Sequence, residues 1–103
     1  MPLDVAILGA DARPELQVSI DLGVHPELME RASALGCPLL LRMADYYADA
    51  EYKSAEVPRL RRELERLRLN PQTPRMAEEL AGALARIARE AEVRNTGLIV
   101  LAD

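Results

Sequence analysis

Strict alternation of apolar and polar side chains over seven residues near the N-terminus limits the fold more than any other feature of this sequence. The apolar members are Leu16, Val18, Ile20 and Leu22, and the polar ones are Gln17, Ser19 and Asp21. A period of two predicts a half-buried β-strand. Residues 3–8 form a second β-rich run, and the turn-rich stretch Gly9–Pro14 joins the two. We therefore predict an antiparallel hairpin whose apolar face needs a cover.

The first predicted helix opens at His25-Pro26-Glu27, because a proline is tolerated in the first turn of a helix. Gly36 and Pro38 close it. Its predicted inner face consists of Leu28, Ala32 and Leu35.

Two further helices follow from apolar residues at helical spacing. Ser54 is expected to cap the second helix, with Pro58 in its first turns, and Thr73 to cap the third, with Pro74 at its first position. The predicted buried stripe of the second helix is Val57, Leu60, Leu64 and Leu67. That of the third, which should end near Arg94–Gly97, is Met76, Leu80, Leu84, Ile87 and Ala91.

The remaining segments complete an α+β prediction. The continuous apolar run Leu98–Leu101 predicts a central strand buried on both faces. Residues 38–43 are expected to form a short buried helix or a turn, and 45–53 show no clear period. The fold class is thus α+β, a small three-stranded, mainly antiparallel sheet made of the hairpin and the C-terminal strand, covered on one face by about three helices.

Chain length limits the number of domains. The 103 residues, of which 50% are hydrophobic, suit one domain over 1–103 and are too few for two ordinary cores. No apolar run approaches the roughly 18 residues of a membrane span, so we expect no membrane partner. With no Phe or Trp, the core must consist of Leu, Ile, Val, Met and Ala, which disfavours a large aromatic-lined pocket.

Charge and cysteine content restrict the partners and the compartment. The net charge is −4, with 10 acidic and 4 basic residues over 1–56 and 7 acidic and 9 basic residues over 57–103. This balance disfavours nucleic acid, and it gives the molecule a dipole that can orient a charged partner. The single cysteine, Cys37, cannot form an internal disulfide, and no secretory signal is recognisable, so a cytoplasmic protein is expected.

Catalytic and metal-binding patterns are weak. His25 and Cys37 lie at opposite ends of the first predicted helix, about 15 to 18 Å apart, which is too far for an activated thiolate. We expect a buried Cys37 and a surface His25. Asp45, Asp49 and Glu51 do not have the spacing of a calcium loop, and no zinc, dinucleotide or P-loop motif occurs. We therefore predict no cofactor, no metal and no enzymatic activity.

A secondary basic face is predicted on the second helix, where Arg59, Arg62 and Arg66 fall together opposite the leucine stripe. Ion pairs of Glu63 with Arg59 and Arg66, and of Glu65 with Arg68, are expected to neutralise much of it. It is interpreted mainly as a solvated face; the alternative is a contact with an acidic protein or with the acidic loop of a second copy.

The most unusual feature is the segment 45–52, which contains all three aromatic residues of the chain among three carboxylates. Tyrosine is enriched at interface hot spots. The candidate partner-binding residues are therefore Asp45, Tyr46, Tyr47, Asp49, Glu51 and Tyr52. The alternative is that one or two of the rings close over the core and leave their hydroxyls in water.

The chain resembles small uncharacterised bacterial proteins in four short patterns. These are Pro38-Leu39-Leu40-Leu41-Arg42, Asp45-Tyr46-Tyr47-Ala48-Asp49, Val57-Pro58 with the leucine-repeat helix, and Thr96-Gly97-Leu98. This resemblance covers about the C-terminal two thirds and implies no activity, cofactor or catalytic residue. In size and acidity the chain is also similar to bacterial toxin-immunity proteins.

The sequence thus predicts a non-enzymatic protein-binding module, immunity-like or regulatory, that uses the segment 45–52. The alternatives are a homo-oligomeric structural protein, joined through the second helix or an uncovered sheet edge, and a small enzyme.

Overall fold

A computed structural model describes residues 3–8 and 14–102 of the chain. Most of the turn predicted over Gly9–Pro14 lies outside the described residues. The elements, in chain order, are β1 (Leu3–Leu8), β2 (Pro14–Ile20), α1 (His25–Ala34), the short 3-10 helix η1 (Leu40–Met43), β3 (Ala50–Tyr52), α2 (Val57–Leu69), α3 (Arg75–Arg94) and β4 (Leu98–Ala102).

The four strands form one antiparallel sheet in the order β2-β1-β4-β3. The α+β class, the antiparallel hairpin and the interior position of β4 are as predicted, but the prediction of three strands was wrong. The fourth strand, β3, has three residues and pairs only with β4, where Glu51 lies opposite Ile99. A strand this short carries too few residues for a period to be visible in the sequence.

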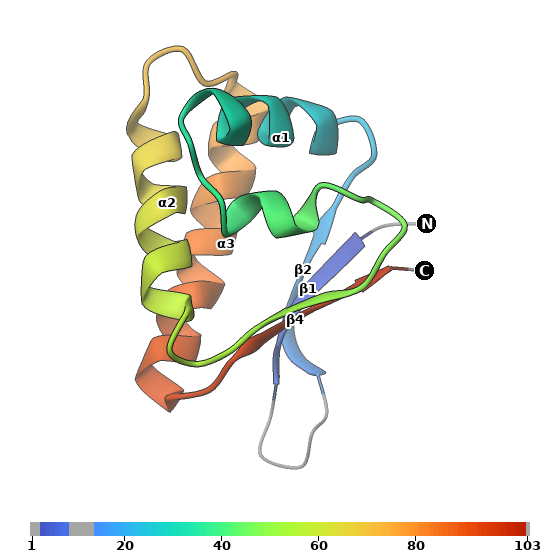
Figure 1. Ribbon diagram of the computed structural model, residues 1–103, viewed down its shortest axis with the longest axis vertical. Coiled ribbons are helices and arrows are strands. Elements are labelled where there is room, and N and C mark those ends of the chain that lie inside the picture. The colour runs from blue at the N-terminus through green and yellow to red at the C-terminus, as the bar shows by residue number, and fades with distance from the viewer. Residues whose placement is uncertain (1–2, 9–13, 103) are drawn as a thin grey trace.

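All the helices lie on one side of the sheet, and α2 and α3 form an antiparallel pair beside α1 and η1 (Figure 1). The strand residues that face them join the helices in one hydrophobic core. Among residues 3–8 and 14–102, no helix covers the opposite face of the sheet, so Ile99 and Leu101 are only half-buried while Leu98 and Val100 are buried. The prediction that this strand is buried on both faces was therefore wrong for its outer face.

The core contains Leu, Ile, Val, Met and Ala, as the absence of Phe and Trp requires, together with Cys37 and two tyrosines. The predicted stripe of α2 is fully buried. That of α3 is correct at Leu84, Ile87 and Ala91 but wrong at Met76, which is exposed in the first turn. Alanines take up much of the buried face of α3, which allows α2 to approach closely; the buried residues are Ala77, Ala81, Leu84, Ala85, Ile87, Ala88 and Ala91.

Both predicted helix caps were wrong. Helix α2 begins at Val57, with Glu56 at the cap position and no side-chain cap bond, so Ser54 does not cap it. Helix α3 is preceded by Pro74, and the Thr73 hydroxyl instead donates to the carbonyl oxygen of Leu67 at 2.8 Å. The same carbonyl also accepts from Asn70 N at 3.2 Å, so Thr73 adds a second hydrogen bond at the end of α2 and ties the two helices together at their connection.

The end of α3 was predicted correctly. Asn95 adopts a left-handed conformation with φ of 53° directly after Arg94, and this reverses the chain into β4. The Thr96 hydroxyl then donates to the carbonyl oxygen of Leu8 at 2.8 Å, and Leu8 N donates to Gly97 O at 3.3 Å. These bonds fix the register in which β4 enters the sheet beside β1.

Residues 38–43 contain the short buried helix that was one of the two predicted forms, since Leu40 and Met43 of η1 are buried. His25, expected on the surface, is instead buried as the first residue of α1. Its Nε2 atom lies 2.6 Å from the carbonyl oxygen of Met43. This bond links the start of α1 to the end of η1 and explains why a polar ring is tolerated inside the protein.

Candidate partner-binding surface

The segment 45–52 leaves η1 and runs along the outside of the molecule into β3 (Figure 1). Its first residues form a tight turn. The Asp45 carboxylate accepts a hydrogen bond from Tyr47 N at 2.9 Å, and Ala48 N donates to the carbonyl oxygen of Asp45 at 3.3 Å. An aspartate that bonds the backbone two residues ahead favours such a turn. The turn sends the side chains of Tyr46 and Tyr47 into different environments.

Tyr46 points into the protein. It is buried, and its hydroxyl donates to the carbonyl oxygen of Ile20 at 2.8 Å. The His25 ring meets its ring edge to face, with 5.0 Å between the ring centroids. Contacts to β2 and α1 therefore hold this ring in place from two directions.

Tyr47 points outward and is 75% exposed. Its ring meets that of Tyr46 edge to face at 5.5 Å between centroids, with an angle of 83° between the planes. Such a geometry is favourable for aromatic pairs. The exposed ring thus rests on a ring that the core holds still.

Tyr52, the last tyrosine of the segment, is also turned inward. It is 2% exposed, and its hydroxyl donates to the carbonyl oxygen of Leu39 at 2.6 Å. Burial raises the pKa of this phenol well above its usual range. The Arg42 guanidinium lies over the ring, 5.2 Å from its centroid. Two of the three rings are therefore part of the core, and their hydroxyls bond to carbonyl groups of the protein.

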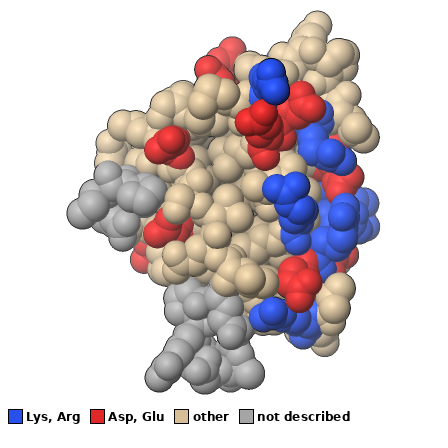
Figure 2. Space-filling model, turned by 180° about the vertical axis from the view of Figure 1, so that it is seen from behind, with Lys and Arg blue, Asp and Glu red and all other residues tan. Residues whose placement is uncertain are grey.

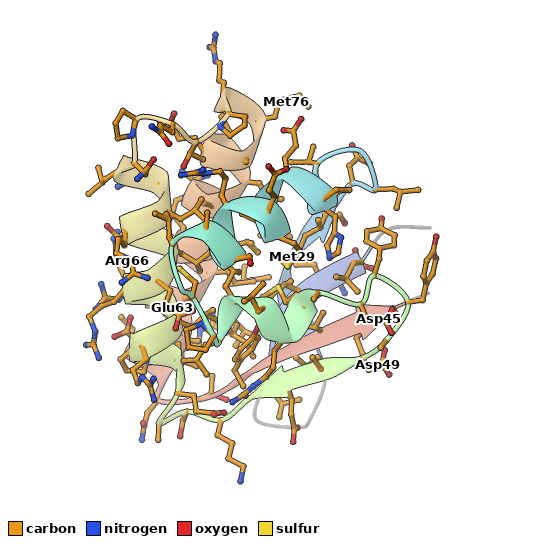
Figure 3. The ribbon with its side chains drawn as sticks, turned by 45° about the horizontal axis from the view of Figure 1, so that its top comes forward. Met29, Asp45, Asp49, Glu63, Arg66 and Met76 are labelled. Atoms are coloured by element: carbon orange, nitrogen blue, oxygen red, sulfur yellow. The ribbon has the colours of Figure 1, made fainter. Side chains whose placement is uncertain are left out.

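The three carboxylates of the segment stay exposed. Asp49 also has a structural contact, since its carboxylate accepts a hydrogen bond from Ala102 N at 2.8 Å and so holds the loop against the end of β4. Figure 3 shows Asp45 and Asp49 on the same side of the molecule, on the loop between η1 and β3. Of the six residues predicted from the sequence, the structure thus leaves four in solvent, and these are Asp45, Tyr47, Asp49 and Glu51.

Arg42 and Glu56, which were not predicted from the sequence, stabilise the end of the segment near Tyr52. Arg42 donates to both oxygens of the Glu56 carboxylate and to the carbonyl oxygen of Glu51. Glu56 also accepts a hydrogen bond from Lys53 N at 3.0 Å. The bonds from Arg42 first, and from the Lys53 amide second, lower the pKa of Glu56 from 4.5 to about 2. A charged, bidentate pair thus fixes the chain on both sides of Tyr52.

The predicted basic face lies on α2, away from the segment 45–52, and Figure 3 shows Arg66 and Glu63 on the opposite side of the molecule from Asp45 and Asp49. The Arg66 guanidinium donates to the carbonyl oxygens of Leu35 at 2.6 Å and of Gly36 at 3.2 Å. It also lies 3.2 Å from the sulfur of Cys37. Arg66 therefore holds the connection between α1 and η1.

Glu63 does not form the ion pairs expected with Arg59 and Arg66. Its carboxylate accepts hydrogen bonds from the amides of Leu39 at 3.3 Å and Leu40 at 2.8 Å, at the start of η1. No signal in the sequence around α2 could show this, because the amides belong to a distant part of the chain. Within the described part of the protein, Arg59 and Arg62 consequently lack a carboxylate partner.

The other arginines of α2 and α3 are largely paired. Glu65 binds Arg89 at 2.6 Å and, as predicted, Arg68 at 3.6 Å, while Glu92 pairs with Arg61. Figure 2 shows basic and acidic side chains interleaved along this side of the molecule. These paired arginines therefore contribute little unbroken positive charge, unlike Arg59, Arg62 and Arg66.

His25 and Cys37 are each engaged elsewhere, the former with Met43 and the latter, which is buried as expected, with Arg66. Across residues 3–8 and 14–102, no three His, Cys, Asp or Glu side chains come together in a way that would hold a metal ion. None of the helices in these ranges combines the length and the apolar character needed to cross a bilayer.

Comparison of the chain with models of protein families, with curated proteins and with solved structures finds no match.

Proposed function

We propose that this chain is a non-catalytic protein-binding module, immunity-like or regulatory, whose contact surface consists of Tyr47 and the carboxylates of Asp45, Asp49 and Glu51. The observation that carries the proposal is an aromatic ring that is 75% exposed yet rests on a buried, hydrogen-bonded ring. A large exposed ring that is already held in one place loses little entropy on binding, which is the property of an interface anchor.

The neighbouring groups suggest the chemistry of the partner. Three carboxylates without an Arg or Lys ion pair among the described residues surround the exposed ring. A partner that offers an apolar pocket for Tyr47 and basic side chains around it would match this arrangement. The charges would act mainly on the rate of association, whereas the ring would supply most of the affinity.

The test compares two aromatic or apolar side chains of nearly equal exposure. Tyr47→Ala is expected to lower the affinity for a partner captured from a lysate of the source cells by about 30-fold or more, as loss of a hot-spot residue does. Val93→Ala is the matched control, because Val93 is 76% exposed but lies on α3. Val93→Ala should keep the wild-type unfolding midpoint, and Tyr47→Ala should lower stability by no more than about 0.5 to 1.5 kcal/mol from loss of its contact with the Tyr46 ring, so both variants stay folded.

A test of the carboxylates requires variants that preserve the turn at residues 45–48. Asp45→Asn and Asp49→Asn remove a charge while keeping an oxygen that can accept the bonds from Tyr47 N and Ala102 N. We expect slower association and a weaker dependence of the rate on salt. If Tyr47→Ala and Val93→Ala retain the same captured protein with the same affinity, the segment 45–52 is not the contact surface.

A further inference from the structure

A small hollow lies in the groove between α2 and α3, and three arginine side chains line it. Its volume is about 190 Å³, and the lining residues are Glu65 and Arg68 of α2 and Gly82, Ala85, Arg86 and Arg89 of α3. Gly82 and Ala85 have almost no side chain, so room is left between the longer arginines. Because two packed helices carry them, the arginines have fixed starting points around one space.

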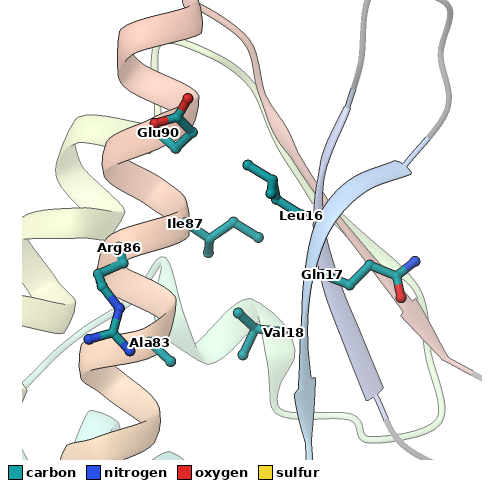
Figure 4. Close-up of a pocket in the computed structure, with 7 residues that line it drawn as sticks. All are labelled: Leu16, Gln17, Val18, Ala83, Arg86, Ile87 and Glu90. Atoms are coloured by element: carbon teal, nitrogen blue, oxygen red, sulfur yellow. The ribbon is translucent and has the colours of Figure 1, made fainter.

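The positive charge around this hollow is only partly neutralised. Among the described residues that line it, Glu65 is the one carboxylate, and it pairs with Arg89 at 2.6 Å and with Arg68 at 3.6 Å. Arg86 has no ion pair within the part of the chain that the structure describes. Figure 4 shows its side chain running along α3, whereas Ile87 points toward β2. Three guanidinium groups and one carboxylate leave an excess of two positive charges.

Most N–H groups of these arginines have no acceptor in the protein. A guanidinium has five N–H donors. Of the three groups, only that of Arg89 forms a hydrogen bond to a described residue, from Nη2 to Glu65. The Nε atom of Arg68 is buried and meets no acceptor among these residues, which is unfavourable for a polar group. A turn of the Arg68 guanidinium toward the hollow would let this N–H donate to an anion bound there.

The glycine in the middle of α3 makes room for Arg68. A Cβ atom on Gly82 would lie 3.3 Å from Cδ of Arg68, a tight contact that would push the arginine stem aside. Glycine inside a helix is less favourable than alanine. The missing side chain therefore keeps Arg68 in its place beside the hollow, although it weakens the helix.

We propose that this hollow binds a phosphate group, either inorganic phosphate or the terminal phosphate of a small molecule. A phosphate monoester carries about −1.5 to −2 charges at pH 7 and three acceptor oxygens, which matches the excess of two positive charges. The planar fork of arginine binds phosphate oxygens in pairs. Pockets for whole small molecules usually exceed about 300 Å³, so a hollow of about 190 Å³ encloses the phosphate group and leaves the rest of an ester in solvent.

Calorimetric titration with inorganic phosphate, at constant ionic strength set with chloride, tests the site. Arg86→Gln should lower the affinity by about tenfold or more, since it removes a charged, bidentate donor. Arg86→Lys keeps the charge but not the fork, so its affinity should lie between the two. Arg75→Gln and Arg59→Gln remove the same charge outside the hollow, the first at a side chain that is 89% exposed on α3. Because salt screens such exposed charges, both should bind within about twofold of the wild type.

A second pair of variants tests the space without changing any charge. Gly82→Leu places a large side chain beside Arg68 and should abolish saturable binding. Ala83→Leu is the matched control, because Ala83 is the next residue of α3 but does not line this hollow. Urea unfolding checks that both variants are folded. In the wild type, phosphate should shift the Nε–H resonance of Arg68 in nuclear magnetic resonance spectra more than that of Arg59.

Comparison of inorganic phosphate with phosphoserine separates the two sources of the group. Tighter binding of phosphoserine supports a phosphate carried by a larger molecule, and equal affinity supports free phosphate. Phosphate that binds no more tightly than chloride would overturn the proposal, as would equal losses of affinity in Arg86→Gln and Arg59→Gln or in Gly82→Leu and Ala83→Leu. Tyr47→Ala should bind phosphate like the wild type, so this site and the surface at 45–52 can fail independently.

Discussion

Replacing Gly97 by alanine should detach β3 from the sheet. Gly97 precedes β4, where that strand passes the end of β3, and a Cβ atom at this position would overlap the carbonyl oxygen of Tyr52. The obstacle is backbone rather than the flexible end of a side chain. The alanine can therefore be accommodated only if the two strands separate or β4 shifts.

The loss of stability caused by Gly97→Ala can be derived from the contacts of Tyr52, the residue at the end of β3. Tyr52 is 2% exposed, and burial of a large apolar side chain contributes about 1.5 to 3 kcal/mol. Its hydrogen bond to Leu39 adds about 1 kcal/mol. Since the freed strand regains some entropy, we expect Gly97→Ala to lower the free energy of unfolding by about 2 to 4 kcal/mol. A domain of this size has about 5 to 15 kcal/mol in total.

Urea unfolding of three glycine variants measures this effect against internal controls. A Cβ atom at Gly23 meets nothing within 4 Å, so Gly23→Ala should change stability by at most about 0.5 kcal/mol. At Gly82, inside α3, it meets only the side chain of Arg68 at 3.3 Å, and the better helix propensity of alanine should stabilise the protein by up to about 1 kcal/mol. Equal midpoints for Gly97→Ala and Gly23→Ala would refute the argument.

Titration of the tyrosines separates local detachment from general weakening. Burial raises the pKa of Tyr52 above its ordinary value of 10.0. In a folded Gly97→Ala protein with β3 detached, ultraviolet absorbance should show this phenol ionising closer to its ordinary pKa. An unchanged titration in the folded variant would mean that Tyr52 remains in the core.

Three further measurements test the fold and its charges. Leu64→Ala should destabilise the protein by about 2 to 5 kcal/mol because Leu64 is fully buried. Arg62→Ala, on the exposed face of α2, should lower the stability by no more than about 0.5 kcal/mol. Similar losses of stability in urea unfolding would mean that the buried face of α2 is misassigned. Amides of β4 should exchange with deuterium more slowly than those of residues 45–49, since β4 is an interior strand, and equal rates would argue against the sheet. The pKa of Glu56 is lowered from 4.5 to about 2, so the stability from its bonds is present above pH 4.5 and is lost as the pH falls toward 2. The difference in unfolding free energy between the wild type and Glu56→Gln should therefore shrink across this range. A pH-independent difference would contradict the assigned pKa.

Elements that depend on local periodicity could be predicted from the sequence, and those that depend on distant partners could not. The second strand of the hairpin and the helices α2 and α3 show their period within a few residues, α1 is bounded by proline and glycine, and β4 is a continuous apolar run. Strand β3 exists only because β4 lies beside it. The burial of His25 likewise depends on Met43, far along the chain.

The same distinction applies to the candidate surface. The sequence drew attention to the segment 45–52 through its composition, but composition cannot say which ring faces inward. That choice depends on the carbonyl groups of Ile20 and Leu39, which accept the hydroxyls of Tyr46 and Tyr52. The predicted ion pairs of Glu63 were wrong for a similar reason, because its carboxylate accepts hydrogen bonds from the amides at the start of η1 instead of pairing with neighbouring arginines.

The pairing of β1 with β4 has a consequence for the speed of folding. Val5 and Val100 lie opposite one another in the middle of the sheet, although nearly the whole chain separates them. The β1-β2 hairpin and the α2-α3 pair can form from nearby residues, but this central pair has to close a very long loop before any contact compensates for the lost entropy. We therefore expect the best-buried strands of the protein to come together late, with refolding slower than in a purely helical chain of the same length.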